Sequence, residues 1–461
     1  MVFNSVIFIF CFLPIFLLIY YFVPARARNP VLFAGSLFFY AWGDPTYLVL
    51  MLFSSFFNYY MGKELGKITD EDPSRKRNLI FAVVINLLIL GFSILGIFSD
   101  TISGITGLKL TYPQLALPIG LSFYTFKNLS YILDIYMGKT EPCKGFFPYA
   151  VYSTMFPHMT AGPIVRYTDI SESISRRSIN TTRLGAGAEL FIKGLSKKVL
   201  LADNLSALYT TLQASGTTSF VGTWLAIGAY TLELYFDFSG YSDMAIGLGQ
   251  MLGFNFNKNF DYPYISTSVS EFWRRWHISL GSWFRDYIYI PLGGNRVSTG
   301  RHIRNILVVW ALTGLWHGAS WNFVFWGVYY GLLLLAEKFL LGRFLEKAPV
   351  WLRNLYTMFA VIIGWVFFSQ TTPAAIGKML GAMFGLGASC FADRASLYAL
   401  KSGLILMIIS VISCRPGLYQ YFKRLARRNT YLAAVINAIL FFLCIAYMIY
   451  SSYTPFMYQQ F

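Results

Sequence analysis

Apolar runs separated by short polar or basic segments recur along almost the whole chain. Runs such as Ser5 to Val23 and Thr430 to Tyr450 are long enough to cross the roughly 30 Å hydrocarbon layer of a bilayer as α-helices. Some runs are short or broken by glycine and proline, so we expect about 11 to 12 crossings together with re-entrant or interfacial helices. The predicted spans lie near residues 3–23, 31–43, 46–62, 78–98, 114–137, 145–161, 184–201, 218–236, 306–336, 354–369, 397–413 and 430–450.

The composition agrees with this pattern, because 56% of the 461 residues are hydrophobic and only 13% are charged. The chain is therefore predicted to be an all-α, polytopic integral membrane protein with a single transmembrane domain over residues 1–461. We divide that domain into N-terminal helices (1–235), a core segment (236–336) and C-terminal helices (337–461). The first apolar run lacks a basic n-region and a clear cleavage site, so we expect a retained span rather than a signal peptide.

The net charge of +16 comes from lysines and arginines that cluster between the apolar runs. This distribution follows the positive-inside rule and favours anionic membrane lipids, rather than nucleic acid, as the partner of the basic residues. Placing the basic connectors in the cytoplasm puts the N terminus outside a multi-pass protein of the cytoplasmic membrane. These connectors are Arg26/Arg28, Lys63 to Arg77, Lys193 to Lys198, Arg274 to Arg304, Lys338 to Arg353 and Arg415 to Arg428.

Basic residues flank the run at 306–336 on both sides, which predicts a turn within it. The residues from Asn305 to Trp316 would climb about 18 Å, roughly to the middle of the bilayer. His317 would then mark the turn, with Gly314 and Gly318 permitting a break or a close backbone approach. A straight, tilted helix is the alternative.

Two histidines are the main candidates for chemistry. His317 lies in a stretch without formal charge, where an ionisable residue suggests a functional site and a neutral imidazole suits a general base. The alternative is a core histidine with one interhelical hydrogen bond. His277 lies in an amphipathic, partly interfacial stretch, where it has either a catalytic or a structural role.

The polar segment from Phe236 to Asn295 must be buried in protein or line a watery cavity if it lies at membrane depth. Asp237 and Asp243 are expected to form structural pairs, or else to orient a histidine or bind an arginine. Arg274, Arg275 and Arg285 would meet the phosphates of a cytoplasmic donor or simply lipid head groups.

The other two histidines do not point to catalysis. His158 belongs to a span end or a re-entrant turn, and His302 is interpreted as a solvated residue beside Arg301 and Arg304. The five cysteines form no C-x-x-C pair, and H-E-x-x-H and G-x-S-x-G motifs are absent from the sequence. We therefore expect no metal site and no serine-hydrolase site within these residues.

Two long blocks resemble the membrane-bound O-acyltransferase family: YFDFSGYSDMAIGLGQMLGFNFNKNFDYPYISTSVSEFWRRWHISLGSWFRDYIYIPLGGNR (235–296) and LTGLWHGASWNFVFWG (312–327). The chain is most similar to the family's bacterial polysaccharide branch, which acetylates alginate. It is more distantly similar to the proteins that transfer D-alanine to teichoic acid. The resemblance implies a ring of helices around a central tunnel. It also implies that His317 occupies the catalytic histidine position and His277 the second polar position, which is histidine or asparagine in the family.

The resemblance implies acetyl transfer from a cytoplasmic thioester, acetyl-CoA or another acyl thioester, across the membrane towards a polysaccharide acceptor, with no bound cofactor. A separate extracytoplasmic acetyltransferase with a serine-dependent site is then an expected partner. D-alanyl transfer from a carrier protein is the enzymatic alternative, and a proton-coupled transporter is the non-enzymatic one. Backbone N–H groups near Gly318, or the indoles of Trp316 or Trp321, would bind the oxyanion. The expected substrate-binding residues are Trp316, Trp321, Asn322, Asp237, Asp243, Arg274, Arg275 and Arg285.

Overall fold

The computed structural model describes residues 1–91, 118–318, 320–450 and 456. These residues form helices and loops, with no strand among them, which confirms the all-α prediction. The chain divides into two compact units, and the division into three segments made from the sequence stays a prediction. The first unit contains residues 1–192 and 241–258, and the second contains residues 193–240 and 259–457.

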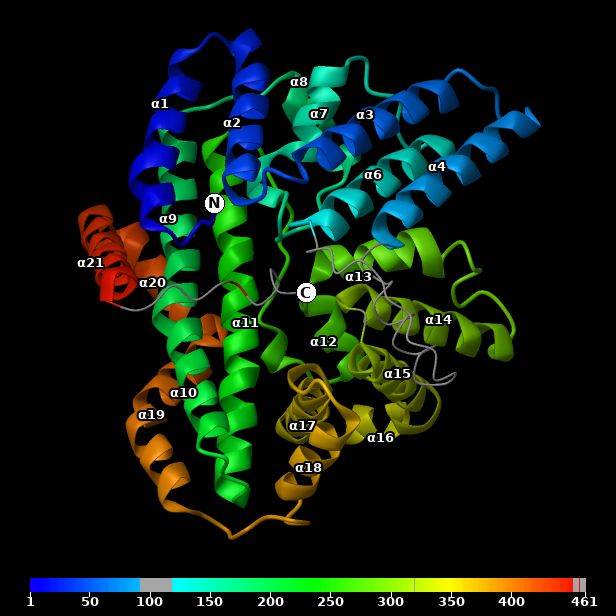
Figure 1. The fold of residues 1–461 in the computed structure, drawn as a ribbon. Helices are drawn as coiled ribbons and strands as arrows, with labels where there is room; N and C mark the ends of the chain where they lie inside the picture. Colours follow the sequence, from blue (N-terminus) through cyan, green and yellow to red (C-terminus); the bar gives the residue numbers. More distant parts are fainter. Residues whose placement is uncertain (92–117, 319, 451–455, 457–461) are drawn as a thin grey trace. The chain divides into compact units, whose positions relative to one another are not determined.

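The first unit is built from helices of the N-terminal part of the chain, and α3, α4 and α6 pack side by side in it (Figure 1). Buried polar side chains connect these helices, since every polar group at membrane depth must find a partner within the protein. The helices are η1 (Phe8–Phe12), α1 (Leu13–Phe22), η2 (Ala25–Ala27), α2 (Arg28–Gly43), α3 (Leu48–Leu65), α4 (Pro73–Gly91), α6 (Leu121–Tyr136), α7 (Phe146–Thr154), η3 (Phe156–His158), α8 (Tyr167–Ser175) and α9 (Thr181–Ser196).

His158 ends the short 3-10 helix η3, in agreement with the turn expected there. Its Nδ1 lies 3.1 Å from Nζ of Lys127, which also donates a hydrogen bond to the carbonyl oxygen of Ser153 at 2.7 Å. Both the lysine and the histidine are fully buried. This pair therefore belongs to the interior of the first unit.

The second unit begins with the last residues of α9, and α11 runs from it into the first unit. Its helices are η4 (Lys197–Ala202), α10 (Asp203–Ala214), α11 (Phe220–Met251), η5 (Pro263–Ile265), α12 (Val269–Arg275), α13 (Ile278–Phe284), η6 (Arg285–Tyr289), α14 (Thr299–His317), α15 (Trp321–Ala336), η7 (Glu337–Leu341), α16 (Gly342–Lys347), α17 (Val350–Ser369), α18 (Pro373–Met383), α19 (Arg394–Ser413), α20 (Pro416–Arg428) and α21 (Thr430–Tyr450).

Four helical stretches of the described chain are long and apolar enough to cross a membrane: Trp321–Lys347, Val350–Ser369, Arg394–Ser413 and Thr430–Tyr450. The span expected at 145–161 is wrong as a crossing, because α7 ends at Thr154 after about 14 Å and a 3-10 turn follows. Parts of the spans expected at 78–98 and 114–137 lie outside the described residues. The number of crossings stays a prediction.

Helix α11 continues beyond the place where its apolar run ends in the sequence. The expected span stopped at residue 236, but the helix extends through the polar stretch to Met251. The polar residues do not end the helix, because buried side chains such as that of Asp237 have partners within the protein. A polar segment at this depth is thus compatible with a regular helix, as long as its side chains are satisfied.

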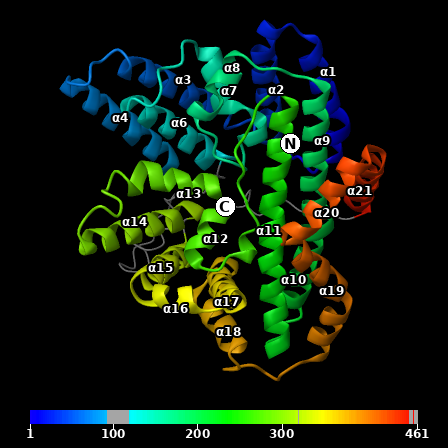
Figure 2. The ribbon, with the colours of Figure 1, turned by 180° about the vertical axis from the view of Figure 1, so that it is seen from behind.

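Helices α14 and α15 form the hairpin expected around His317, and they lie against each other (Figure 2). Helix α14 ends at His317 and α15 begins at Trp321, so the alternative of one straight helix is wrong. A Cβ atom at Gly314 would lie 2.3 Å from the carbonyl oxygen of Phe323, and one at Gly327 would lie 2.2 Å from that of Trp310. Only glycine permits this approach of the two backbones.

Candidate active site

His317 is the last residue of α14, and aromatic side chains surround its imidazole ring. The residue is 4% exposed. The ring centroid lies 4.9 Å from that of Trp326 and 5.2 Å from that of Phe368, with the planes nearly perpendicular in both cases. The negative end of the α14 dipole stabilises positive charge at this position, including the imidazolium that forms when the ring accepts a proton.

His277 lies between α12 and α13 with its backbone in the left-handed region, at φ +44°. Tyr262 is the other non-glycine residue with a positive φ among the described residues. Such a conformation costs on the order of 1–3 kcal/mol and is often found at functional sites. Asparagine and histidine adopt this conformation more readily than most residues.

Asn259 determines which nitrogen of His277 carries the hydrogen. The Asn259 Oδ1 atom accepts hydrogen bonds from the backbone N–H of Ser279 at 3.2 Å and from its hydroxyl at 2.9 Å. Nδ1 of His277 lies 3.2 Å from the same oxygen. Since an amide oxygen only accepts, Nδ1 must be the protonated atom, and Nε2 carries the lone pair.

Trp316 brings the two histidines into one site, because its ring contacts both of them. Its centroid lies 4.7 Å from that of His317 and 6.0 Å from that of His277. On its other side, His277 lies 4.6 Å from the ring of Phe238 on α11. The site therefore gathers residues from α11, the α12–α13 junction, α14, α15 and α17. Sequence reasoning had not assigned Asn259, Trp326 or Phe368 to it, although Asn259 and Trp326 lie within the two blocks that resemble the family.

The remaining residues expected after the hairpin turn have different surroundings. Trp321 is 48% exposed, whereas Asn322 is buried and donates a hydrogen bond from Nδ2 to the carbonyl oxygen of Phe367 at 3.2 Å. Asn322 thus ties the start of α15 to α17. Trp316 and Trp321 were both named from the sequence as oxyanion donors. The ring of Trp316 lies against that of His317.

The two aspartates of α11 belong to different units. Asp237 accepts a hydrogen bond from Nζ of Lys198 at 2.7 Å, and the same Nζ lies 2.8 Å from Asp203. Its ionic partner is therefore a lysine of η4 and not an arginine of the 274–285 segment. This is the structural pairing favoured from the sequence. Asp243, which is half-buried, lies further along α11 in the first unit.

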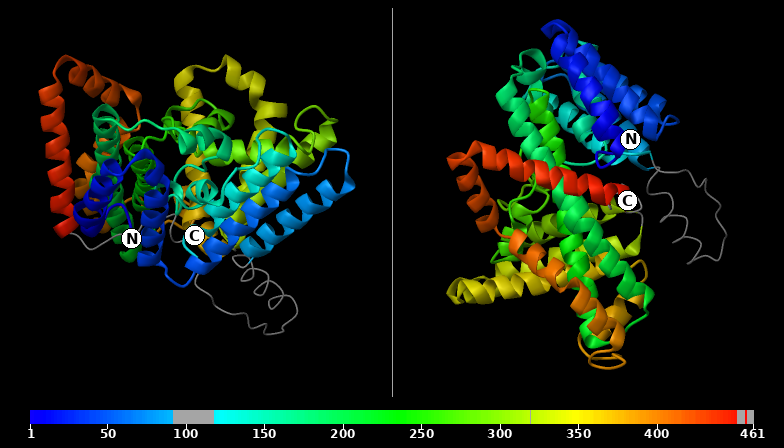
Figure 3. Two further views of the ribbon diagram at one scale, coloured as in Figure 1. Left: turned by 90° about the horizontal axis from the view of Figure 1, so that it is seen from above. Right: turned by 90° about the vertical axis from the view of Figure 1, so that its left-hand side faces the viewer.

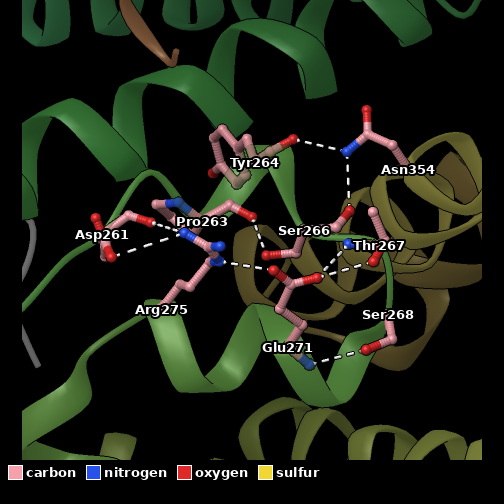
Figure 4. A network of polar contacts seen from close by, with 9 residues as sticks. All are labelled: Asp261, Pro263, Tyr264, Ser266, Thr267, Ser268, Glu271, Arg275 and Asn354. Carbon is pink, nitrogen blue, oxygen red and sulfur yellow. Dashed lines mark hydrogen bonds and ion pairs between the residues drawn. The ribbon is translucent and has the colours of Figure 1, made fainter. Parts of the chain in front are cut away.

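The three arginines expected to contact the donor differ in exposure. Arg274 is exposed, and Arg285 is exposed beside Asp286, which it contacts at 2.7 Å. Arg275 instead belongs to a network around α12 (Figure 4), where its Nε donates to Glu271 at 2.9 Å and its Nη1 donates to the carbonyl oxygen of Asp261 at 3.1 Å.

Glu271 holds this network together. Partial burial acts to raise the pKa of Glu271, but hydrogen bonds from Thr267 and Arg275 outweigh burial and hold the pKa below its ordinary value. Asn354 of α17 adds hydrogen bonds to the carbonyl oxygens of Tyr264 and Ser266, at 3.0 and 2.9 Å (Figure 4). The loop that leads into α12 is thereby attached to α17.

Glu337 stabilises the other side of the beginning of α12. Its carboxylate accepts hydrogen bonds from the backbone N–H groups of Val269 at 2.5 Å and Ser270 at 2.9 Å, and from the Ser270 hydroxyl at 2.8 Å. A buried carboxylate at a helix N-terminus satisfies unpaired donors and favours the helix dipole. Sequence reasoning missed this residue, because the contact joins positions that are far apart in the chain.

The expectation that His302 is solvated is wrong. The residue is 5% exposed, and its Nε2 lies 3.0 Å from the Tyr289 hydroxyl and 3.3 Å from Nζ of Lys338. Neighbouring arginines in the sequence suggested a surface position, but the side chain of His302 points from α14 towards η6 and η7.

The model of the membrane-bound O-acyltransferase family matches residues 143–376, which include both candidate histidines. The chain is 40% identical over 434 residues to a protein of Azotobacter vinelandii named "Probable alginate O-acetylase AlgI", covering 92% of this chain and 86% of the relative. It is 32% identical to the peptidoglycan O-acetyltransferase of Helicobacter pylori (84% and 80% covered). It is 26% identical to the teichoic acid D-alanyltransferase of Bacillus subtilis (48% and 59% covered).

Proposed function

Because this chain belongs to the membrane-bound O-acyltransferase family, we propose that it transfers an acetyl group from a cytoplasmic thioester towards a hydroxyl of an extracytoplasmic polysaccharide. Membership of this family means that the chain is a membrane-bound acyltransferase and not a transporter without enzymatic activity. The observation that carries the site assignment is the convergence of His317, His277 and Trp316 in one buried aromatic environment.

In this proposal His317 is the general base. Its imidazole accepts the proton of the acceptor hydroxyl while the oxygen attacks the thioester carbonyl carbon. The tetrahedral intermediate collapses with cleavage of the carbon–sulfur bond, and the imidazolium returns the proton to the departing thiolate. His277, with its Nε2 lone pair, assists from the other side of Trp316 by accepting a hydrogen bond from a bound substrate.

The oxyanion of the intermediate needs hydrogen-bond donors in a desolvated site. We assign this role to the indole N–H of Trp316 or to the backbone N–H groups near Gly318, as expected from the sequence. The indole N–H of Trp326 is a further candidate. It is buried against His317 and has no hydrogen-bond partner among the described residues.

Acetyl-CoA is the proposed donor, and Arg274 and Arg285 are the exposed groups that would meet its phosphates. The acceptor would be an alginate-like or cell-wall polysaccharide, as the names of the two O-acetylating relatives suggest. An extracytoplasmic serine-dependent transferase would complete the transfer to the polymer. D-alanyl transfer is the second candidate, supported only by a relative that matches about half of the chain.

The test is acetyl transfer by the purified protein in proteoliposomes, with labelled acetyl-CoA supplied from the cytoplasmic side. His317→Ala should lower the rate at least about 10²- to 10⁴-fold, the range typical of general base catalysis. His302→Ala is a matched control that removes a buried histidine elsewhere on α14. Unchanged transfer by the His317 variant would refute the assignment. Activity with a D-alanyl carrier protein but not with acetyl-CoA would favour the second candidate.

A further inference from the structure

Helix α20 lies in the chain between two candidate membrane-spanning helices. It connects α19 and α21, which are both long and apolar enough to cross a bilayer. Only Cys414 and Arg415 precede it after the end of α19, and only Asn429 separates it from α21. Its 13 residues span about 20 Å, too short for a crossing. Figure 3 shows α20 running crosswise to α21, so it lies along the surface if α21 crosses.

The sequence of α20 separates apolar from basic side chains around the helix. At about 100° per residue, Leu418, Tyr419, Tyr421, Phe422, Leu425 and Ala426 share one side, and Gln420, Lys423, Arg424, Arg427 and Arg428 share the other. No residue of α20 is buried in the protein. Tyr421 is 57% exposed and Phe422 42% exposed, so part of the apolar side is left uncovered.

The basic side has no acidic counterpart within the described protein. The four basic residues of α20 are exposed and form no ion pair among the described residues. The sequence from Arg394 to its end contains no aspartate or glutamate. Nζ of Lys193, in α9, lies 4.2 Å from the ring centroid of Tyr419 in α20. The basic side therefore calls for an anionic partner that the described residues do not supply.

We propose that α20 is an interfacial anchor that binds anionic phospholipids of the cytoplasmic leaflet. Its exposed aromatic side chains enter the acyl region, and Lys423, Arg424, Arg427 and Arg428 contact the lipid phosphates. The lipid surface is the proposed occupant because α20 connects two candidate spans and because its C-terminal half, from Lys423 to Arg428, combines exposed basic residues with an uncovered apolar side. This inference is independent of the acyl-transfer reaction.

The experiment compares the full-length protein in nanodiscs of phosphatidylcholine with and without phosphatidylglycerol. Each basic residue near an anionic surface strengthens association about fivefold, so replacing all four by glutamine should weaken phosphatidylglycerol enrichment by up to about 600-fold. Enrichment is measured by mass spectrometry of the lipids that remain bound. The matched control replaces Lys63, Lys67, Lys76 and Arg77, which lie in a connector that also carries Glu64, Asp70, Glu71 and Asp72. This control should change enrichment little.

The position of the helix is tested separately, with fluorescent labels in a background where the exposed Cys11 and Cys390 are serine. A label at Tyr421→Cys should be quenched by lipids that carry a quencher in the acyl chain, whereas one at Arg424→Cys should not. Quenching at neither position, or equal lipid enrichment in the quadruple variant and the wild type, would overturn the proposal. Binding of acetyl-CoA, instead of lipid, to the basic side would overturn it as well, and would appear as loss of donor affinity in the quadruple variant with unchanged lipid enrichment.

Discussion

Replacing Glu337 by alanine should disorder α12 and, through it, the position of His277. The carboxylate accepts hydrogen bonds from two backbone N–H groups of the first turn, those of Val269 and Ser270. Leaving a buried donor without a partner costs about 1–3 kcal/mol, so the two together cost about 2–6 kcal/mol. A helix of seven residues has little stability of its own. His277 follows the end of α12 closely in the chain, so a disordered α12 would no longer hold His277 in place.

Hydrogen–deuterium exchange of the peptide that covers residues 266–277 measures this effect directly. Glu337→Ala should speed exchange there and lower the transfer rate, and Glu337→Gln should do so less, because the amide keeps one acceptor oxygen. Glu346→Ala, at an exposed glutamate of α16, is the control. Wild-type exchange in the Glu337→Ala variant would show that the carboxylate does not hold α12, and the positional argument would fail.

Three further predictions concern neighbouring parts of the second unit. His277→Asn should retain more activity and a higher melting temperature than His277→Ala, because asparagine tolerates the left-handed backbone; equal values for the two variants would contradict this. Gly314→Ala should cost about 1–3 kcal/mol through its contact with α15, as judged by thermal melts against Gly300→Ala, whose added Cβ meets nothing within 4 Å. The depressed pKa of Glu271 implies stability that is present above the ordinary carboxylate pKa and lost as pH falls through the lower folded value. Glu271→Gln should therefore melt below wild type at neutral pH but not in acid, and a constant difference across pH would count against the network.

The sequence by itself determined the features that depend on local composition and spacing. Apolar runs require helices, because a bilayer offers no partners for backbone N–H and C=O groups. The turn at His317 followed from basic residues on both sides of one run and from nearby glycines, and the break between α14 and α15 confirms it. His317 and His277 were identified as candidates from residue type and family resemblance, and their roles stay proposals.

Tertiary structure decided what depends on contacts between distant positions. The tautomer of His277 follows from Asn259, and the backbone N–H groups of Val269 and Ser270 at the start of α12 find their acceptor in Glu337, yet these partners are far apart in the sequence. The partner of Asp237 proved to be Lys198, and His302 proved to be buried, because the direction of a side chain depends on the packing of its helix rather than on its neighbours in sequence. Periodicity gives the existence of a helix, but the side chains that meet across helices are set only when the helices pack together.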